Sequence, residues 1–369
     1  MSGVYIHIPF CASKCPYCDF YSMRAGSELK EKYVEAVCDE IKTSRRAGGY
    51  LNGGFKSDTL YLGGGTPSEL DGVQLLRIIS LARKEYAVPD DGEITVECNP
   101  SSDIEALLPY LKEAGVNRIS LGMQSADEAE RKKLGRMSGR ERILTVTDML
   151  QRGGIENISL DIMLGVPLQT EASLRSTLDF ARQTGAKHIS TYVLKLEEGT
   201  FFYKNRDKLS LPDENSVCDM FELCCRELGN AGFEHYEISN FAMPGFEGRH
   251  NTKYWLLEDY LGIGAAAHSF VGGKRFFYER DINSFIEGAS PVSDGVGGDS
   301  FEYIMLRLRL KKGLSLSETA ARYGEDAVSG IIKKAPLYTR GGLIHFDGDN
   351  VSLTEKGMLL SNAIICSFI

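Results

Sequence analysis

The sequence has no excess of positive charge and no long apolar run, and these absences narrow the functions open to it. Its 369 residues include 42 lysines and arginines against 51 aspartates and glutamates, a net charge of −9. Because nucleic-acid binding depends on neutralising phosphates with basic side chains, this balance disfavours a nucleic-acid partner. No apolar stretch approaches the roughly 20 residues of a membrane-spanning helix. No signal-peptide pattern is visible either, and we therefore expect a cytoplasmic protein.

Zinc-finger and disulfide-framework patterns are also missing, although the chain has nine cysteines. Cys11, Cys15 and Cys18 form a C-x3-C-x2-C run. Thiolates are the usual ligands of [4Fe-4S] clusters, and three of them would leave the fourth iron open to a small molecule. Zinc prefers four ligands, and no matching second pair follows, since Cys224 and Cys225 are adjacent. The spacing favours a cluster, with zinc or unrelated thiols as alternatives.

Strand and helix patterns alternate along residues 1–195. A pattern of glycine, three residues and Ile-Ser begins at Gly115, Gly154 and Gly185. Each glycine ends an amphipathic helix, where a left-handed cap suits a residue without Cβ, and each Ile-Ser opens an apolar strand. Such alternation predicts parallel β/α units. About six units fit before residue 195, which favours an α/β fold with a partial (β/α)6 barrel; an open doubly wound sheet is the alternative.

The rest of the chain divides into two parts. Residues 196–290 are predicted to form a helical and β extension, although the stretch 233–270 shows little periodicity. A run rich in glycine and serine at 288–300 predicts a linker. Residues 291–369 carry short helix and strand patterns, including one helix over 354–364, and we expect a small winged-helix-like module there.

Polar residues mark the ends of the predicted strands. A Gly-Gly-Gly-Thr-Pro run at 63–67 lacks the Lys-Ser or Lys-Thr of a P-loop, and its bare backbone allows a ligand to approach closely. Glu97, Gln124 and Asp161 lie at or near the carboxyl ends of three strands, the edge where ligands gather in parallel β/α folds. Each of these three residues taken alone could be a structural residue with a hydrogen-bonding partner. Three of them at one edge of the sheet favour a binding pocket. Arg136 carries a planar guanidinium suited to a ligand carboxylate.

The cysteine and glycine runs resemble those of the radical S-adenosylmethionine (SAM) superfamily. The segments 5–11, 63–67, 122–125 and 161–167 further resemble the branch that contains oxygen-independent coproporphyrinogen III oxidase and the heme chaperones of the HemW family. The resemblance implies a [4Fe-4S] cluster on the three cysteines, with SAM on its open iron. The residues that it implies as contacts to SAM or the cluster are Tyr5, Tyr17, Gly64, Gly65, Thr66, Glu97, Gln124, Arg136 and Asp161.

Three features separate oxidases from chaperones in this branch. The oxidases have an N-terminal extension, for which we find no counterpart, and a further cysteine at the position of Phe20. The segment 250–255, His-Asn-Thr-Lys-Tyr-Trp, resembles the H-N-x-x-Y-W motif of the chaperones and contains the single tryptophan. The resemblance implies that His250 binds heme, because imidazole is a common ligand of heme iron. His7 and His268 are alternatives.

The resemblance therefore predicts a heme chaperone that uses a [4Fe-4S] cluster, SAM and heme and delivers heme to an acceptor protein. Transient contact with membrane respiratory proteins is part of this expectation. Coproporphyrinogen oxidation in porphyrin biosynthesis is the first alternative, although we expect that activity to be absent. A radical enzyme with another substrate, in which the His250 segment is structural, is the second alternative.

Overall fold

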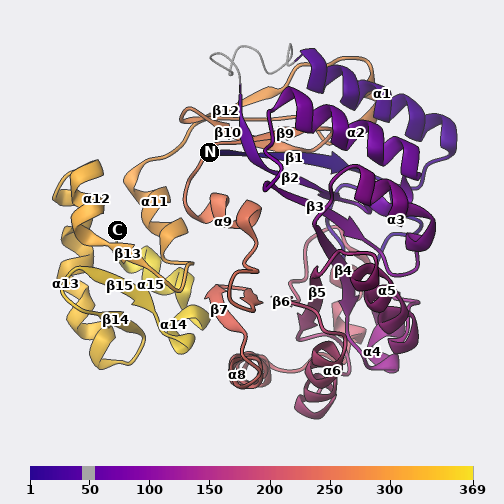
Figure 1. Ribbon diagram of the computed structural model, residues 1–369. Helices are drawn as coiled ribbons and strands as arrows, with labels where there is room; N and C mark the ends of the chain where they lie inside the picture. The colour runs from indigo at the N-terminus through magenta and orange to yellow at the C-terminus, as the bar shows by residue number, and fades with distance from the viewer. Residues whose placement is uncertain (44–54, 369) are drawn as a thin grey trace.

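A single large sheet organises the molecule. The computed structural model describes residues 1–43 and 55–368, and its 12-stranded sheet has the order β12-β11-β10-β9-β1-β2-β3-β4-β5-β6-β8-β7. Strands β1 to β6 are adjacent in chain order and parallel, which confirms the predicted partial (β/α)6 barrel (Figure 1). These strands are β1 (Ser2–Ile8), β2 (Ser57–Gly64), β3 (Glu93–Cys98), β4 (Arg118–Gln124), β5 (Asn157–Leu164) and β6 (His188–Val193).

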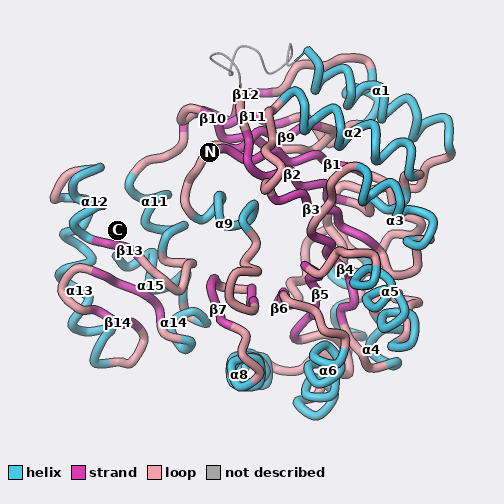
Figure 2. Tube along the Cα trace, in the orientation of Figure 1, coloured by secondary structure: helices cyan, strands magenta, loops and turns pink. Residues whose placement is uncertain are grey.

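Helices between these strands cover the outer face of the sheet (Figure 2). Leu60 and Leu62 of β2 are fully buried in the core, whereas Tyr61 between them bonds to Glu97 on the concave face. The alternation of side chains along a strand thus leaves one apolar face for the helices and one polar face for a site. The helices are α1 (Ser27–Thr43), η1 (Pro67–Glu69), α2 (Gly72–Glu85), α3 (Ile104–Glu113), α4 (Glu128–Lys133), α5 (Arg140–Arg152) and α6 (Glu171–Gln183).

The three repeated glycines follow helices, as predicted. Gly115, Gly154 and Gly185 have φ angles of 81°, 92° and 74°, and they follow α3, α5 and α6. This left-handed backbone strongly favours glycine. The next strands, β4, β5 and β6, then begin within three residues of each glycine.

The part of the chain that follows β6, up to residue 296, adds strands to both edges of the barrel sheet. On one edge, β9 pairs in parallel with β1, and β10, β11 and β12 continue the sheet in antiparallel order. On the other edge, β8 and β7 follow β6. The predicted linker at 288–300 is therefore wrong in part, since it contains β12. The elements are α7 (Phe201–Lys204), η2 (Arg206–Lys208), α8 (Glu214–Asn230), β7 (Glu234–Glu237), β8 (Asn240–Ala242), α9 (Arg249–Trp255), β9 (Tyr260–Ile263), β10 (His268–Val271), β11 (Lys274–Phe277), α10 (Ile282–Ile286) and β12 (Val292–Val296).

The C-terminal module lies beside the barrel (Figure 1). Its helices pack around a three-stranded antiparallel sheet of order β13-β15-β14, in keeping with the predicted winged-helix-like module. The helix predicted over 354–364 is two helices, with Leu360 between them. The elements are α11 (Ser300–Arg307), β13 (Leu314–Ser315), α12 (Leu316–Tyr323), α13 (Asp326–Arg340), β14 (Ile344–Phe346), β15 (Asn350–Leu353), α14 (Glu355–Leu359) and α15 (Ser361–Phe368).

No helix within residues 1–43 and 55–368 has both the length and the apolar character needed to cross a membrane.

Candidate functional site

The cysteine loop begins where β1 ends, at the carboxyl edge of the parallel strands. The backbone ties both ends of the loop together, since Cys11 N donates to Met23 O at 3.0 Å and Met23 N donates to Pro9 O at 2.8 Å. Within it, Cys18 N donates to Cys15 O at 3.1 Å. All three thiols are free and partly exposed. The loop therefore holds its three thiols on a fixed backbone at the edge of the concave face.

The chemistry of the donor set fits an iron–sulfur cluster. Within residues 1–43 and 55–368, no group of three or more histidine, cysteine, aspartate or glutamate side chains converges closely enough to hold one metal ion. A [4Fe-4S] cluster has different needs, because each thiolate binds a different iron and the sulfurs need not meet at one point. Three partly exposed thiols on one tied loop meet that requirement.

The glycine run packs directly against the cysteine loop. Gly65 N donates to Ile8 O at 2.9 Å, and Thr66 Oγ1 lies 3.4 Å from Cys11 Sγ. A Cβ on Gly65 would come within 2.8 Å of the carbonyl oxygens of Ile8 and Phe10. Gly64 has a φ of 109°, a conformation that favours glycine. Gly64 and Gly65 are therefore favoured over residues with a side chain, because the backbone here packs closely against the cysteine loop. An ordinary tight turn would not need both glycines.

Two buried carboxyl groups lie on the concave face. Glu97 accepts hydrogen bonds from Tyr61 Oη at 2.7 Å and from Gly64 N at 3.1 Å. Burial raises the pKa of Glu97 to about 7, while the Tyr61 hydrogen bond acts in the opposite direction. Asp161 accepts a hydrogen bond from Ser120 Oγ at 3.1 Å. Burial raises the pKa of Asp161 to about 6, against the effect of hydrogen bonds from Ser190 and Ser120.

Gln124 and Arg136 both approach Gly122, which pairs with Asp161 on the neighbouring strand. Gln124 has a φ of 66°, unusual for a residue with a side chain, at a bulge that ends β4. Backbone strain of this kind is often found at functional sites. A Cβ on Gly122 would lie 3.1 Å from Gln124 Nε2 and 3.4 Å from an Arg136 terminal nitrogen. Arg136 in turn donates to Tyr17 Oη from two nitrogens, at 3.1 and 2.8 Å, which links it to the cysteine loop.

Tyr5 belongs to the same group of residues. Its hydroxyl lies 3.0 Å from His7 Nδ1, and its ring centroid is 6.1 Å from that of Tyr61. The structure therefore brings the predicted SAM residues and the cysteines to one edge of the concave face. Their individual roles toward SAM stay predictions.

Several supporting residues were missed by the sequence interpretation. Tyr61 holds Glu97, and Ser120 and Ser190 hold Asp161. Both serines belong to the repeated Ile-Ser pattern, which by itself predicts only the start of a strand. Tyr61 lies two residues before Gly63 in β2, so strand alternation places both on the same face.

His250 lies away from the cysteine loop, in α9, near the amino ends of β1 and β2. The residue is 1% exposed. Its Nδ1 lies 2.8 Å from Thr59 Oγ1 and its Nε2 lies 2.9 Å from Tyr254 Oη, so both ring nitrogens have partners inside the protein. The ring also stacks on Tyr61, with centroids 5.2 Å apart. This geometry argues against the prediction that His250 binds heme iron, because no ring nitrogen is available without breaking a buried hydrogen bond.

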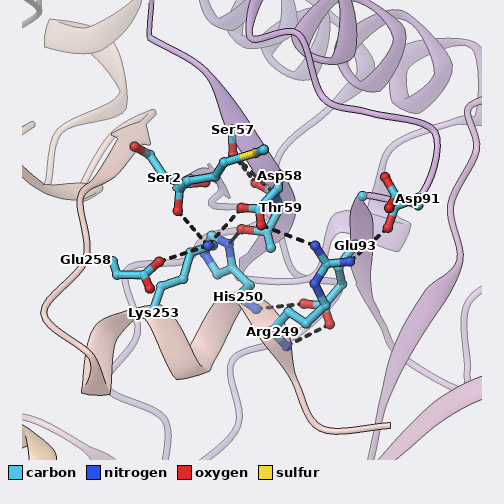
Figure 3. Close-up of polar contacts among 12 residues, drawn as sticks. Ser2, Ser57, Asp58, Thr59, Asp91, Glu93, Arg249, His250, Lys253 and Glu258 are labelled. Atoms are coloured by element: carbon cyan, nitrogen blue, oxygen red, sulfur yellow. Dashed lines mark hydrogen bonds and ion pairs between the residues drawn. The ribbon is translucent and has the colours of Figure 1, made fainter. Parts of the chain in front are cut away.

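The neighbours of His250 form a dense polar network (Figure 3). The Glu93 carboxylate accepts hydrogen bonds from the backbone N–H groups of Arg249 and His250, at 2.8 and 2.9 Å, and so caps the start of α9. Lys253, which is 6% exposed, bonds to Met1 O at 2.7 Å and pairs with Asp58 at 2.8 Å. The motif at 250–255 thus fastens α9 across the amino ends of the first three strands.

Comparisons with known proteins agree with this arrangement. The family model described as "Radical SAM superfamily" matches residues 5–181, and the "HemN C-terminal domain" model matches residues 300–360. A solved coproporphyrinogen III oxidase (HemN) from Escherichia coli, described as a radical SAM enzyme, has the same fold, with a TM-score of 0.84 and 24% identity over 99% of this chain and 89% of that one. Residues 5–181, which carry the cysteine loop, thus match the radical SAM family model, and the chain has the fold of this solved oxidase.

Relatives of known name identify the family within this class of proteins to which the chain belongs. The heme chaperone HemW of Bacillus subtilis is 34% identical over 100% of this chain and 99% of its own length. The heme chaperone HemW of Escherichia coli K12 is 33% identical, with 100% and 98% covered. The chain belongs to the HemW family.

Proposed function

We propose that this protein is a heme chaperone, which binds heme and delivers it to an acceptor protein. The observation that carries the proposal is the match to relatives named heme chaperone HemW along the whole chain. Phe20 supports it, because the oxidases of the branch have a cysteine at this position. We further propose that the protein acts in the cytoplasm and makes transient contact with membrane respiratory proteins that accept heme.

The cofactor part of the proposal places a [4Fe-4S] cluster on Cys11, Cys15 and Cys18. When bound, the cluster would supply the electron that cleaves SAM. The neighbouring residues of this chain would bind and orient SAM. The proposed contacts are Tyr5, Tyr17, Gly64, Gly65, Thr66, Glu97, Gln124, Arg136 and Asp161. Among them, the carboxylates would accept hydrogen bonds from ribose hydroxyls or the ammonium group, and Arg136 would pair with the SAM carboxylate.

SAM binding should strengthen as the pH rises. Glu97 and Asp161 keep their protons up to about pH 7 and about pH 6, so at lower pH they offer fewer acceptors to SAM. We expect affinity to rise between about pH 5 and pH 8 and then level off. Isothermal titration calorimetry of the cluster-loaded protein with SAM across this pH range measures the affinity. Glu97→Gln should remove the part of the rise near pH 7. An affinity independent of pH would contradict the proposed role of both carboxylates.

Without SAM, the raised pKa of Glu97 makes the folded protein less stable as the pH rises. The pKa of Glu97 is raised from 4.5 to about 7 by folding, so the unfolded chain ionises first as the pH rises. The folded state therefore loses stability between these two values. Thermal unfolding of SAM-free protein at pH 5 and pH 7.5 should show this loss, and Glu97→Gln should reduce it.

Two assays distinguish the chaperone from the oxidase. We expect full-length protein to bind hemin stoichiometrically and to transfer it to an apo-hemoprotein. We also expect no protoporphyrinogen when reconstituted protein is incubated with coproporphyrinogen, SAM and a reductant. Protoporphyrinogen formation would favour the oxidase, and a failure to bind hemin would refute the chaperone proposal.

A further inference from the structure

The six histidines differ sharply in whether they can reach a ligand. His7 is buried, with Nδ1 on Tyr5 and Nε2 on the Tyr21 carbonyl, each at 3.0 Å. His188 is buried between Ser159 Oγ at 2.7 Å and Tyr236 Oη at 2.8 Å. With His250, three histidines therefore have both ring nitrogens engaged.

Among the remaining three histidines, one on the barrel is free to bind a ligand. His235 stacks on Phe241 with ring centroids 4.2 Å apart, and its Nε2 is enclosed by protein. His345 is exposed, but it lies on β14 of the C-terminal module. His268 is exposed on the barrel itself. Its side chain makes no hydrogen bond or ion pair within residues 1–43 and 55–368, and it is the accessible imidazole of the barrel sheet.

The strand register places His268 on the concave face. Tyr260 of β9 pairs with Gly3 of β1 on one side and with Phe270 of β10 on the other. Residues paired across strands point to the same face, and so do residues two positions apart along one strand. His268 therefore shares the face of Tyr260 and of Tyr5. Because β9 runs parallel to β1, the turn that leads into His268 lies at the same edge as the cysteine loop.

The surroundings of His268 orient its imidazole ring and place charged side chains near it. Its ring stacks on Phe277, with centroids 5.1 Å apart and planes at 23°. Arg280 and Arg275 bring positive charge close to this ring, and Asp294 brings a negative charge. Imidazole supplies the lone pair that a metal requires.

The segment that follows His268 and Phe277 is fastened to the cysteine loop. Arg280 donates to Asp19 O at 2.8 Å, and its guanidinium lies 3.6 Å from the Asp19 carboxylate. Ile282 N donates to Tyr21 Oη at 2.9 Å. These contacts hold the β10–β11 hairpin beside the candidate cluster site.

We propose that His268 is the residue of this chain that binds the iron of heme, with Phe277 orienting the imidazole by stacking on it and Arg280 near the carboxylates of heme. The proposal rests on the proposed heme-chaperone function, and it moves the iron ligand from α9 to the carboxyl edge of the barrel. Histidine is a common axial ligand in heme proteins, and a cationic side chain complements the propionate groups.

The test is hemin titration of cluster-free, full-length protein, followed by the Soret band. His268→Ala should weaken hemin binding at least about tenfold and shift the Soret maximum. His345→Ala, which removes the other exposed histidine, should leave both unchanged. In His268→Gly, added free imidazole should restore the wild-type spectrum, a result that a merely structural role would not produce.

The outcomes separate the two proposals. If wild-type protein does not bind hemin, the proposed function fails. If wild-type protein binds hemin and His268→Ala binds it equally well, the function stands and the assignment of His268 is overturned. An equal loss in His345→Ala would also overturn it, because the loss would then not be specific to His268. No rescue of His268→Gly by imidazole would do the same, because the loss would then be structural.

Discussion

Cys15→Ser should abolish the bound iron–sulfur cluster. After anaerobic reconstitution, we expect iron to fall from about four atoms per chain to background, since two thiolates cannot hold a cluster that normally has three or four. Cys15 is the middle ligand of the loop, and its carbonyl accepts the hydrogen bond from Cys18 N, so serine preserves the backbone while removing the sulfur. Iron and acid-labile sulfide analysis, with the visible absorption of the cluster, measures the effect.

A matched control is available in the same chain. Cys366 is an exposed, free cysteine of α15 in the C-terminal module. Cys366→Ser should retain the full iron content. Wild-type iron in Cys15→Ser would contradict the assignment of the loop, and hemin binding should survive in this variant, because its proposed ligand lies on β10.

His250→Ala should destabilise the fold rather than weaken heme binding. The substitution leaves the Thr59 and Tyr254 hydroxyls without their partner and removes the ring that stacks on Tyr61. Unsatisfied buried groups and a new cavity together cost about 3 kcal/mol in free energy of unfolding. Urea unfolding measures this loss. His250→Gln, which keeps a donor and an acceptor, should lose less.

Asn251 provides the comparison, because it is the next residue of α9 and is only partly buried. Asn251→Ala should change the free energy of unfolding by less than about 1 kcal/mol. A His250→Ala variant with wild-type stability and no Soret band after hemin addition would contradict this prediction. The buried hydrogen bonds of His250 would then not be those of the functional state, and His250 would again be the candidate heme ligand.

Features with a local signature could be predicted from the sequence. The spacing of Cys11, Cys15 and Cys18 and the helix-ending glycines at 115, 154 and 185 depend on neighbouring residues only. The parallel order of β1 to β6 follows from the same repetition, because each helix returns the chain to the next strand.

Features that depend on distant residues could not be predicted. Thr59 and His250 are separated by 191 positions, and no local pattern indicates that they touch. The motif at 250–255 was therefore interpreted through its resemblance, which names residues but not their orientation. Strands such as β9, with four residues, are too short to show a period, so their pairing with β1 appears only in the structure.

Mössbauer spectroscopy of protein reconstituted with ⁵⁷Fe, before and after SAM is added, tests the central claim most directly. Three cysteine ligands predict a [4Fe-4S] cluster in which one iron is distinct and alone changes its signal when SAM binds. Four equivalent irons that ignore SAM, or zinc in the place of iron, would contradict the account.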